Sequence, residues 1–106
     1  MPLPMYSRVI RYRWLPGHAG EGPRLVRALL ASAEGHPDLL AAHVLRALEG
    51  SQEGIVVFDW ASRAALERHR LATPLEQVAP WAIPLLHWRT DQCYEHETPV
   101  QAHGAR

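Results

Sequence analysis

The stretch Gly54-Ile-Val-Val-Phe-Asp-Trp-Ala-Ser-Arg-Ala-Ala-Leu-Glu-Arg-His69 decides the fold of this chain. It begins with an apolar run rich in β-branched residues, 55–58, which predicts a buried strand. Ser62 then occupies the position of a helix N-cap, and good helix formers follow it. The stretch therefore predicts a strand that leads directly into a helix. Trp60 lies at the junction, and His69 lies about two turns into the helix.

Turn and cap residues divide the rest of the chain into similar short elements. Pro16-Gly17 and Gly35-His36-Pro37 mark breaks, and Pro23 suits the first turn of a helix. Thr73 suits an N-cap with Pro74 at the first helical position, which predicts a short helix that ends near residue 79. The sequence thus predicts strands over 6–15, 39–48, 54–60 and 85–96, and helices over 23–35, 62–71 and 74–79.

Residues 39–48 are compatible with two structures. Their intrinsic propensities allow a helix. A strand is favoured because the segment follows a Gly-x-Pro break, ends at a Gly-bounded loop and is followed at once by the next strand, as in a hairpin. The resulting order, β-α-β-β-α-β, predicts an α+β, ferredoxin-like fold: an antiparallel sheet with helices on one face.

Side-chain alternation assigns faces to the first and last strands, because every second side chain of a strand shares a face. In the first strand, Tyr12 and Trp14 share a face with Arg8. In the last strand, strict alternation places Leu86 and Trp88 on the same face. The mixed polarity of these faces predicts a sheet that is covered on both sides or that lines a semi-polar cavity.

Charge and composition exclude several classes of function. Eleven basic residues, all Arg, balance eleven acidic ones without any basic cluster, so neither nucleic acid nor an anionic membrane surface finds electrostatic support. The lack of Lys excludes Schiff-base chemistry through lysine. The single Cys93 excludes an intrachain disulfide and a zinc site built on cysteines. The histidines show no compact ligand spacing, so we expect no metal.

The length of 106 residues predicts a single domain, 1–106, with its core at about 5–96. Residues 97–106 are polar and lack periodicity, which predicts a flexible tail or an arm that docks on a dimer partner. The N-terminus lacks the features of a signal peptide, and the apolar runs are far too short to span a membrane. We therefore expect a cytoplasmic protein.

The predicted sheet leaves one face without helices. Its strands carry few acidic residues, and the formal net charge of the chain is +0 at pH 7. A nearly neutral protein associates with itself more readily than a highly charged one. We therefore expect a homodimer in which two copies pack through their sheet faces.

Four motifs follow the order and spacing of one known family: Leu15-Pro16-Gly17, Gly35-His36-Pro37-Asp38-Leu39, Phe58-Asp59-Trp60-Ala61-Ser62 and Leu66-Glu67-Arg68-His69. On these motifs, over residues 9–94, the chain resembles the antibiotic biosynthesis monooxygenase (ABM) family of the dimeric α+β barrel superfamily. The most specific feature is the Trp-x-Ser at the end of the third strand together with the helical histidine. The resemblance implies a ferredoxin-like chain that dimerises into a barrel.

The activities that the resemblance implies differ within the family. Some members are cofactor-free oxygenases that convert polycyclic phenols to quinones. They carry Asn and Tyr at the positions of Val56 and Leu66. Other members degrade haem and carry Asn, Trp and His at the positions of Ile10, His69 and Ala79. None of these residues is present in this chain, and of the family's functional positions only Trp60, at the end of the third strand, carries over.

Our leading hypothesis is a small-molecule enzyme of the ABM type: a cofactor-independent monooxygenase that acts on an aromatic or phenolic compound. Trp60 would shape the pocket, and His69 would be the base that removes a phenolic proton. Tyr12, Trp88 and His43 are further candidates for lining the substrate pocket. The hypothesis requires no cofactor.

Each of these assignments has an alternative. Trp60 can be a packing residue that locks the helix onto the sheet, and His69 can be a core histidine whose hydrogen bonds are satisfied. At the level of function, the first alternative is a non-catalytic ligand-binding or scaffold domain with the same fold. The second alternative is a haem-binding or haem-degrading protein.

Overall fold

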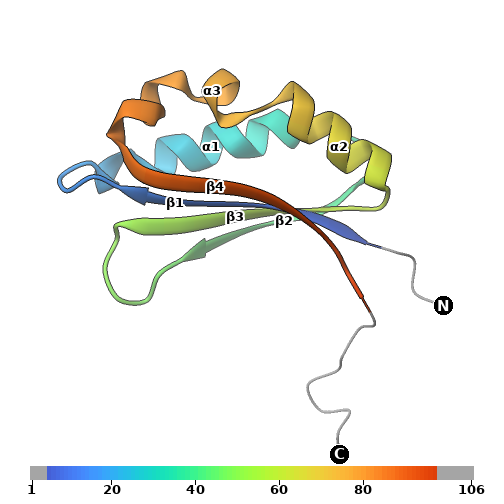
Figure 1. Ribbon diagram of the computed structural model, residues 1–106, viewed down its shortest axis with the longest axis horizontal. Coiled ribbons are helices and arrows are strands. Elements are labelled where there is room, and N and C mark those ends of the chain that lie inside the picture. Colours follow the sequence, from blue (N-terminus) through green and yellow to red (C-terminus); the bar gives the residue numbers. More distant parts are fainter. Residues whose placement is uncertain (1–4, 98–106) are drawn as a thin grey trace, which may run out of the picture.

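Within residues 5–97, which the computed structural model describes, four strands form one antiparallel sheet in the order β2-β3-β1-β4 (Figure 1). The strands are β1 (Tyr6–Trp14), β2 (Leu39–Arg46), β3 (Glu53–Trp60) and β4 (Leu86–Glu95). The chain therefore has the predicted ferredoxin-like α+β fold. The segment 39–48, which was compatible with helix or strand, forms a strand.

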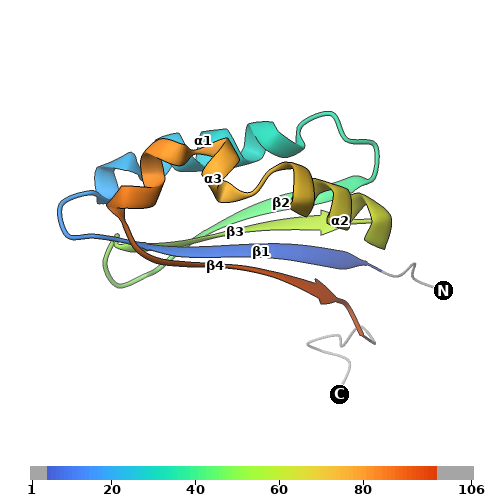
Figure 2. The same ribbon diagram turned by 45° about the horizontal axis from the view of Figure 1, so that its top comes forward.

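The helices all lie on one face of the sheet, as the two views in Figures 1 and 2 show. They are α1 (Gly22–Ala33), α2 (Arg63–Ala72) and the single-turn α3 (Leu75–Val78), with short 3-10 segments η1 (Ala19–Glu21) and η2 (Pro80–Leu85). None of these helices is both long and apolar enough to cross a membrane.

The core lies between this helical layer and the sheet. Ile10, Val56 and Phe58 point from the strands toward the helices and are almost completely buried. Leu25 and Leu29, one helical turn apart, supply the buried stripe of α1. Burial of this apolar surface is the main force that holds the two layers together.

The local signals at two helix ends are confirmed. The Ser62 hydroxyl oxygen accepts a hydrogen bond from the amide of Ala65 at 3.1 Å, so Ser62 is the N-cap of α2. Gly35 has a φ of +82°, the left-handed conformation that glycine adopts readily after a helix. Ser62 also donates to the Asp38 carboxylate at 2.9 Å, which joins the start of α2 to the loop before β2.

The predicted role of Thr73 as the N-cap of the next helix is wrong. The Thr73 hydroxyl donates to the carbonyl oxygen of His69 and accepts a hydrogen bond from Arg8, so it closes the end of α2. Pro74 is the residue before the first turn of α3, and it is not the first helical residue. The local sequence suited a cap, but the buried cation Arg8 provides a stronger partner for this hydroxyl.

The strict alternation predicted for the last strand is also wrong at its start. Leu86 pairs with Trp14 on the helical face, whereas Trp88 pairs with Arg13 on the opposite face, because the register shifts between Arg13 and Trp14. Such a bulge moves the following side chains to the other face of the sheet. Trp88 therefore does not point toward the helices.

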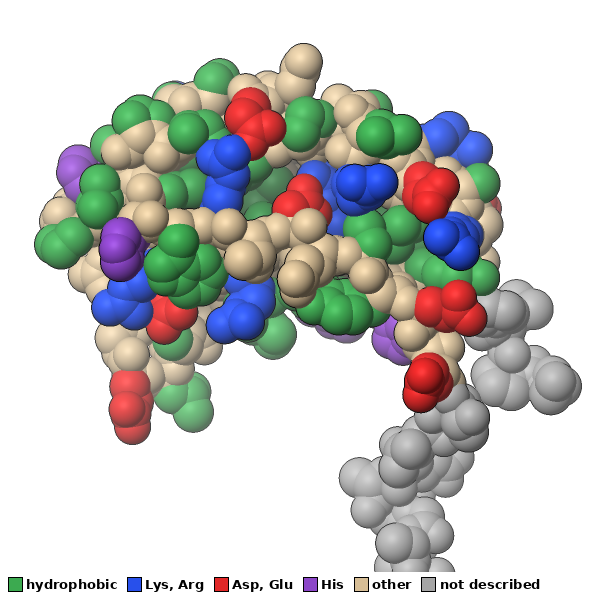
Figure 3. Space-filling model, in the orientation of Figure 1, with side chains coloured by type: hydrophobic (Ala, Val, Ile, Leu, Met, Phe, Trp, Pro, Cys, Tyr) green, Lys and Arg blue, Asp and Glu red, His purple; other side chains and the backbone are tan. Residues whose placement is uncertain are grey.

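The face of the sheet that carries no helix is the open face. It includes Val9, Ile55 and Val57 at its centre, all of intermediate exposure. In the view of Figure 3, acidic and basic side chains are interspersed over the molecule and do not gather into a single patch. The predicted tail, apart from Glu97, lies outside the described residues.

Candidate functional site

The two residues predicted to carry the chemistry meet at one end of the interface between helices and sheet. Trp60 ends β3 on the helical face, and His69 points from α2 toward the same face. Their ring centroids are 5.0 Å apart, and the His69 ring lies 4.9 Å from that of Phe58. Trp60 is 0% exposed and His69 is 2% exposed, so both side chains are packed inside the protein.

Both ring nitrogens of His69 are engaged. Nδ1 lies 3.1 Å from Nη1 of Arg8, and because a guanidinium can only donate, Nδ1 must accept. Nε2 therefore carries the proton and donates to the Ser32 hydroxyl at 3.1 Å, while that hydroxyl donates to the carbonyl of Leu29. These contacts fix a single neutral tautomer and leave neither nitrogen free for a substrate.

The surroundings of His69 also disfavour its protonation. Burial away from water, followed by the nearby Arg8 cation, lowers the pKa of His69 from 6.5 to about 4. The imidazole is consequently neutral at pH 7 and a weak base.

Arg8 is fully buried and holds this end of the interface closed. Its guanidinium forms two hydrogen bonds with the Asp91 carboxylate on β4, at 2.9 and 2.6 Å. It also donates to the carbonyl oxygen and the hydroxyl of Thr73, each at 3.0 Å. One charged side chain thus joins β1, β4 and the end of α2, and the paired carboxylate balances its charge.

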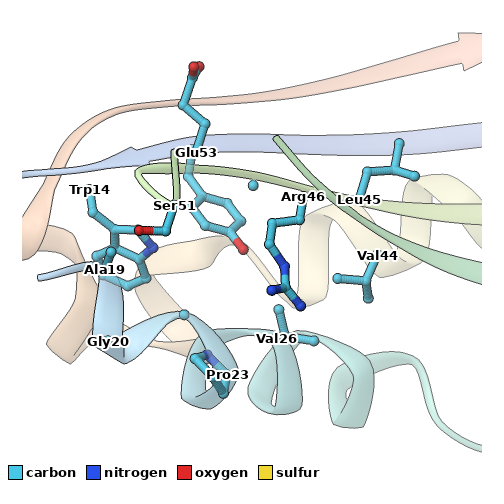
Figure 4. Close-up of a pocket in the computed structure, with 13 residues that line it drawn as sticks. Trp14, Ala19, Gly20, Pro23, Val26, Val44, Leu45, Arg46, Ser51 and Glu53 are labelled. Atoms are coloured by element: carbon cyan, nitrogen blue, oxygen red, sulfur yellow. The ribbon is translucent and has the colours of Figure 1, made fainter. Parts of the chain in front are cut away.

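A cavity lies at the other end of the interface between helices and sheet, between the start of α1, the end of β1 and the β2–β3 hairpin (Figure 4). Its volume is about 540 Å³. Val26 from α1 and Val44 from β2 form apolar walls, and the aromatic rings of Tyr12 and Trp14 line it from β1. Two smaller cavities, of about 290 and 190 Å³, lie between α2 and β4 and on the open face. Trp60 and His69 line none of the three.

Gly54 creates the space that Tyr12 occupies. The two residues pair directly across β1 and β3 on the helical face. A Cβ atom at position 54 would overlap the phenol end of Tyr12, so the ring lies across the glycine. Burial raises the pKa of Tyr12 above 10, which keeps its hydroxyl protonated and able to donate a hydrogen bond at neutral pH.

Arg46 brings a positive charge to the same cavity. It pairs with Gly54 from the other side, across β2 and β3, so Arg46 and Tyr12 flank the glycine on one face. In Figure 4 the Arg46 side chain extends from its strand toward Val26 on α1. No carboxylate among residues 5–97 forms an ion pair with Arg46.

The five predicted site residues do not form a single site. Tyr12 lines the cavity of about 540 Å³, whereas Trp60 and His69 are packed inside the protein away from it. Trp88 and His43 point to the open face: Trp88 lies under the Arg11 guanidinium, 5.7 Å from its ring centroid, and His43 contacts the Asp59 carboxylate at 2.8 Å. Arg46 is not among the residues predicted from the sequence, although a glycine within a strand, such as its neighbour Gly54, is a general signal of close packing.

Among residues 5–97, no group of three or more His, Cys, Asp or Glu side chains is arranged to hold a metal ion. At the positions where haem-degrading relatives carry functional Asn and His, Ile10 and Ala79 are buried in the core. Their side chains provide neither an iron ligand nor a hydrogen bond, so this part of the chain does not fit haem.

Known structures share this fold over nearly their whole length. Protein PA3566 from Pseudomonas aeruginosa is 23% identical with a TM-score of 0.69, over 92% of this chain and 98% of that one. A putative antibiotic biosynthesis monooxygenase from Chloroflexus aurantiacus is 22% identical with a TM-score of 0.63, over 94% and 97%. SnoaB from Streptomyces nogalater, a cofactor-independent oxygenase solved as a mutant, is 17% identical with a TM-score of 0.70, over 93% and 97%.

Sequence comparison identifies the family. No curated protein matches the chain. A family model described as antibiotic biosynthesis monooxygenase matches residues 5–79, which include β1, both long helices and the Trp60–Ser62 motif. Since the match covers well over half of the 106 residues, the chain belongs to the antibiotic biosynthesis monooxygenase family.

Proposed function

We propose that this protein is a small-molecule enzyme, a cofactor-independent monooxygenase that acts on an aromatic or phenolic compound bound between α1 and the β2–β3 hairpin. The observation that supports it is the cavity of about 540 Å³, which combines aromatic and aliphatic walls with the Tyr12 hydroxyl and the Arg46 guanidinium. Small-molecule sites have volumes of a few hundred Å³, with mostly apolar walls and a few polar groups that fix the orientation of the ligand.

The proposed reaction uses the substrate itself as the reductant. A phenol with a ring C–H loses its hydroxyl proton, and the phenolate transfers electrons to O₂. One oxygen atom forms a new carbonyl on the ring and the other leaves as water, so that one phenol and one O₂ give one quinone and one water. The likeness to SnoaB, a cofactor-independent oxygenase, supports this reaction class.

In this proposal Tyr12 touches the substrate, and the Trp60–His69 cluster supports the site. The Tyr12 hydroxyl donates a hydrogen bond to the substrate oxygen, on which negative charge develops. Trp60 and His69 hold α2 against the sheet. Their predicted roles, as pocket wall and as base, would need a cavity at the α2 end of the interface. His69 can accept a proton from a substrate only after its contact with Arg8 is broken.

Oxygen uptake with a panel of hydroxylated anthracene-type compounds tests the proposal. The wild-type chain is expected to consume one O₂ per quinone formed, and Tyr12→Phe is expected to lower kcat/KM about tenfold, because one donor to the developing charge is lost. Tyr94→Phe is the matched control, because Tyr94 is half exposed on β4 and lines a different cavity. Absence of both binding and oxygen uptake across the panel would refute the proposal.

A non-catalytic binding domain is the second candidate, and the engaged nitrogens of His69 favour it. An enzyme that removes a substrate proton through a histidine needs a free ring nitrogen, and both nitrogens of this histidine are occupied, by Arg8 and Ser32. Calorimetric titration of the same panel separates the two candidates. Binding accompanied by oxygen uptake supports the enzyme, whereas binding without uptake supports the binding domain.

We further propose that two copies pack through their open faces. No helix of the described chain covers this face, although it carries the half-buried Val9, Ile55 and Val57. The family barrel consists of two such sheets. Light scattering after size exclusion is expected to give twice the chain mass of 11.9 kDa. A particle of single-chain mass would contradict the dimer.

A further inference from the structure

We infer that the cavity between α1 and the β2–β3 hairpin selects anions, so that its ligand is an aromatic carboxylate or an ionised phenol. The anionic oxygen would lie between the Arg46 guanidinium and the Tyr12 hydroxyl. This inference rests on the proposed function only in taking the cavity as the substrate site.

The first argument is the unbalanced charge of Arg46. Arg8, Arg13, Arg24, Arg63 and Arg89 each form an ion pair with a carboxylate. Arg46 has no such partner among residues 5–97, and the same holds for Arg11, Arg27, Arg68 and Arg70; of these five, Arg46 is the one that lines the cavity of about 540 Å³. Arg46 is exposed, and a guanidinium without a counter-ion at the solvent-facing rim of a cavity favours an anionic ligand over a neutral one.

No carboxylate from the described part of the chain faces Arg46 inside the cavity. Glu53 provides the only carboxylate among its lining residues, and the Glu53 side chain forms an ion pair with Arg13 at 3.2 Å. Figure 4 shows the Glu53 carboxylate directed away from the Arg46 side chain. This orientation follows from the strand, because Glu53 and Gly54 are neighbours and successive side chains point to opposite faces. Among the lining residues, Arg46 is therefore the only charged group on the cavity side of the sheet.

The second argument is the arrangement of donors. Tyr12, Gly54 and Arg46 lie side by side on β1, β3 and β2, with the glycine in the middle. Because Gly54 has no side chain, the Tyr12 phenol lies across β3, on the face from which Arg46 projects. No residue within 5–97 accepts a hydrogen bond from the Tyr12 hydroxyl, so the neutral donor and the charged donor are both available to a ligand. Two donors on one face of neighbouring strands suit a carboxylate or a phenolate oxygen.

The consequence for the proposed reaction is that no protein base is required. A site that binds the phenolate more tightly than the phenol lowers the apparent pKa of the bound substrate by linkage, and the proton leaves to solvent. This explains how a cavity without a histidine can still provide the electron-rich phenolate.

Two matched probes test the inference: anthracene-2-carboxylate, which is an anion, and 2-(hydroxymethyl)anthracene, which is neutral and has the same ring. Their fluorescence is titrated with the full chain at pH 7. We expect the wild-type chain to bind the carboxylate about tenfold more tightly than the alcohol. Arg46→Gln should weaken carboxylate binding about tenfold and change alcohol binding less than about twofold.

Arg68→Gln is the matched control, because it removes the same charge from an exposed position on α2 that lines none of the three cavities. It should leave the affinity for both probes unchanged. Circular dichroism of each variant verifies that the fold is retained.

The outcomes distinguish this inference from the proposed function. Equal affinity for both probes in the wild-type chain, or a carboxylate affinity that Arg46→Gln does not change, would overturn the anion selectivity and leave the small-molecule site standing. Failure of either probe to bind, in a chain that also takes up no oxygen with the phenol panel, would overturn the site itself.

Discussion

The two ends of the interface between helices and sheet differ in how the chain fills them. At the α2 end, large rings and a buried cation fill the space between α2 and the two central strands: Trp60, Phe58, His69 and Arg8 pack against one another. At the α1 end, Gly54 leaves room for the Tyr12 phenol, and a cavity of about 540 Å³ opens beside these two residues. Trp60 and His69, the most specific residues of the family motif, therefore lie apart from the cavity of about 540 Å³.

The difference follows from the volume of single side chains on neighbouring strands. Position 60 of β3 carries the largest side chain and pairs with Tyr6, whereas position 54 of the same strand carries none and pairs with Tyr12. Protein interiors are packed densely, so a place with less side-chain volume either collapses or holds a ligand. The phenol of Tyr12 fills only part of the space at this end.

The largest expected effect on stability comes from removing the Trp60 indole at the α2 end. Trp60→Ala removes a fully buried indole that contacts His69 and should lower the free energy of unfolding by about 3–5 kcal/mol. Urea unfolding measures the loss. Trp81→Ala is the control, because Trp81 is only partly buried beside Arg24 and should cost clearly less. Equal losses of unfolding free energy for the two variants would mean that the surroundings of Trp60 are not packed more tightly than those of Trp81.

A smaller effect should appear as a pH dependence of stability at the closed end. The pKa of His69 is lowered from 6.5 to about 4, so between these values the unfolded chain binds a proton that the folded chain does not. The contribution of His69 to the free energy of unfolding is complete above pH 6.5. It falls by about 3 kcal/mol as the pH decreases toward 4. The difference in unfolding free energy between the wild-type chain and His69→Asn should therefore grow from pH 4 to pH 7.

His87→Asn is the control for this pH series, because His87 is exposed on β4. Its unfolding free energy should follow that of the wild-type chain across the same range. A difference between the wild-type chain and His69→Asn that stays constant with pH would show that His69 is not held neutral by burial.

The smallest of the three effects concerns the open end. Gly54→Ala places a methyl group against the Tyr12 phenol and should cost about 1–3 kcal/mol through overpacking. It should also displace Tyr12 and weaken the binding of aromatic probes. Gly20→Ala is the matched control, because the added methyl group meets no atom within 4 Å although Gly20 lines the same cavity. If both variants bound the probes like the wild-type chain, the space above Gly54 would not be the ligand site.

The elements of the fold were predictable because they depend on local signals. The Ser62 cap and the left-handed Gly35 can be read from a few adjacent residues, and both occur as expected. The two errors, at Thr73 and at the start of β4, both arose where a distant partner overrides a local preference. Thr73 bonds to Arg8, 65 residues away, and the β4 register shifts at its pairing with Trp14.

The site was less predictable for a related reason. Trp60 and His69 are 5.0 Å apart between their ring centroids, but the period of a strand or helix does not reveal whether the space between two residues is filled. The juxtaposition of Tyr12, Gly54 and Arg46 depends on the registers of three strands. A shift of one residue would put each side chain on the other face, so this cavity could be found only from the folded chain.

The buried Arg8 also has a consequence for the order of events in folding. Its partners lie 61 to 83 residues further along the chain, so its contacts form only after β1, α2 and β4 have all assembled. Contacts between such distant segments carry a large loop-closure cost and are expected to form late. The contacts of the Arg8 guanidinium would then change the rate of folding little and would mainly lower the rate of unfolding. The native chain would therefore be kinetically stable, because it unfolds slowly once it has folded.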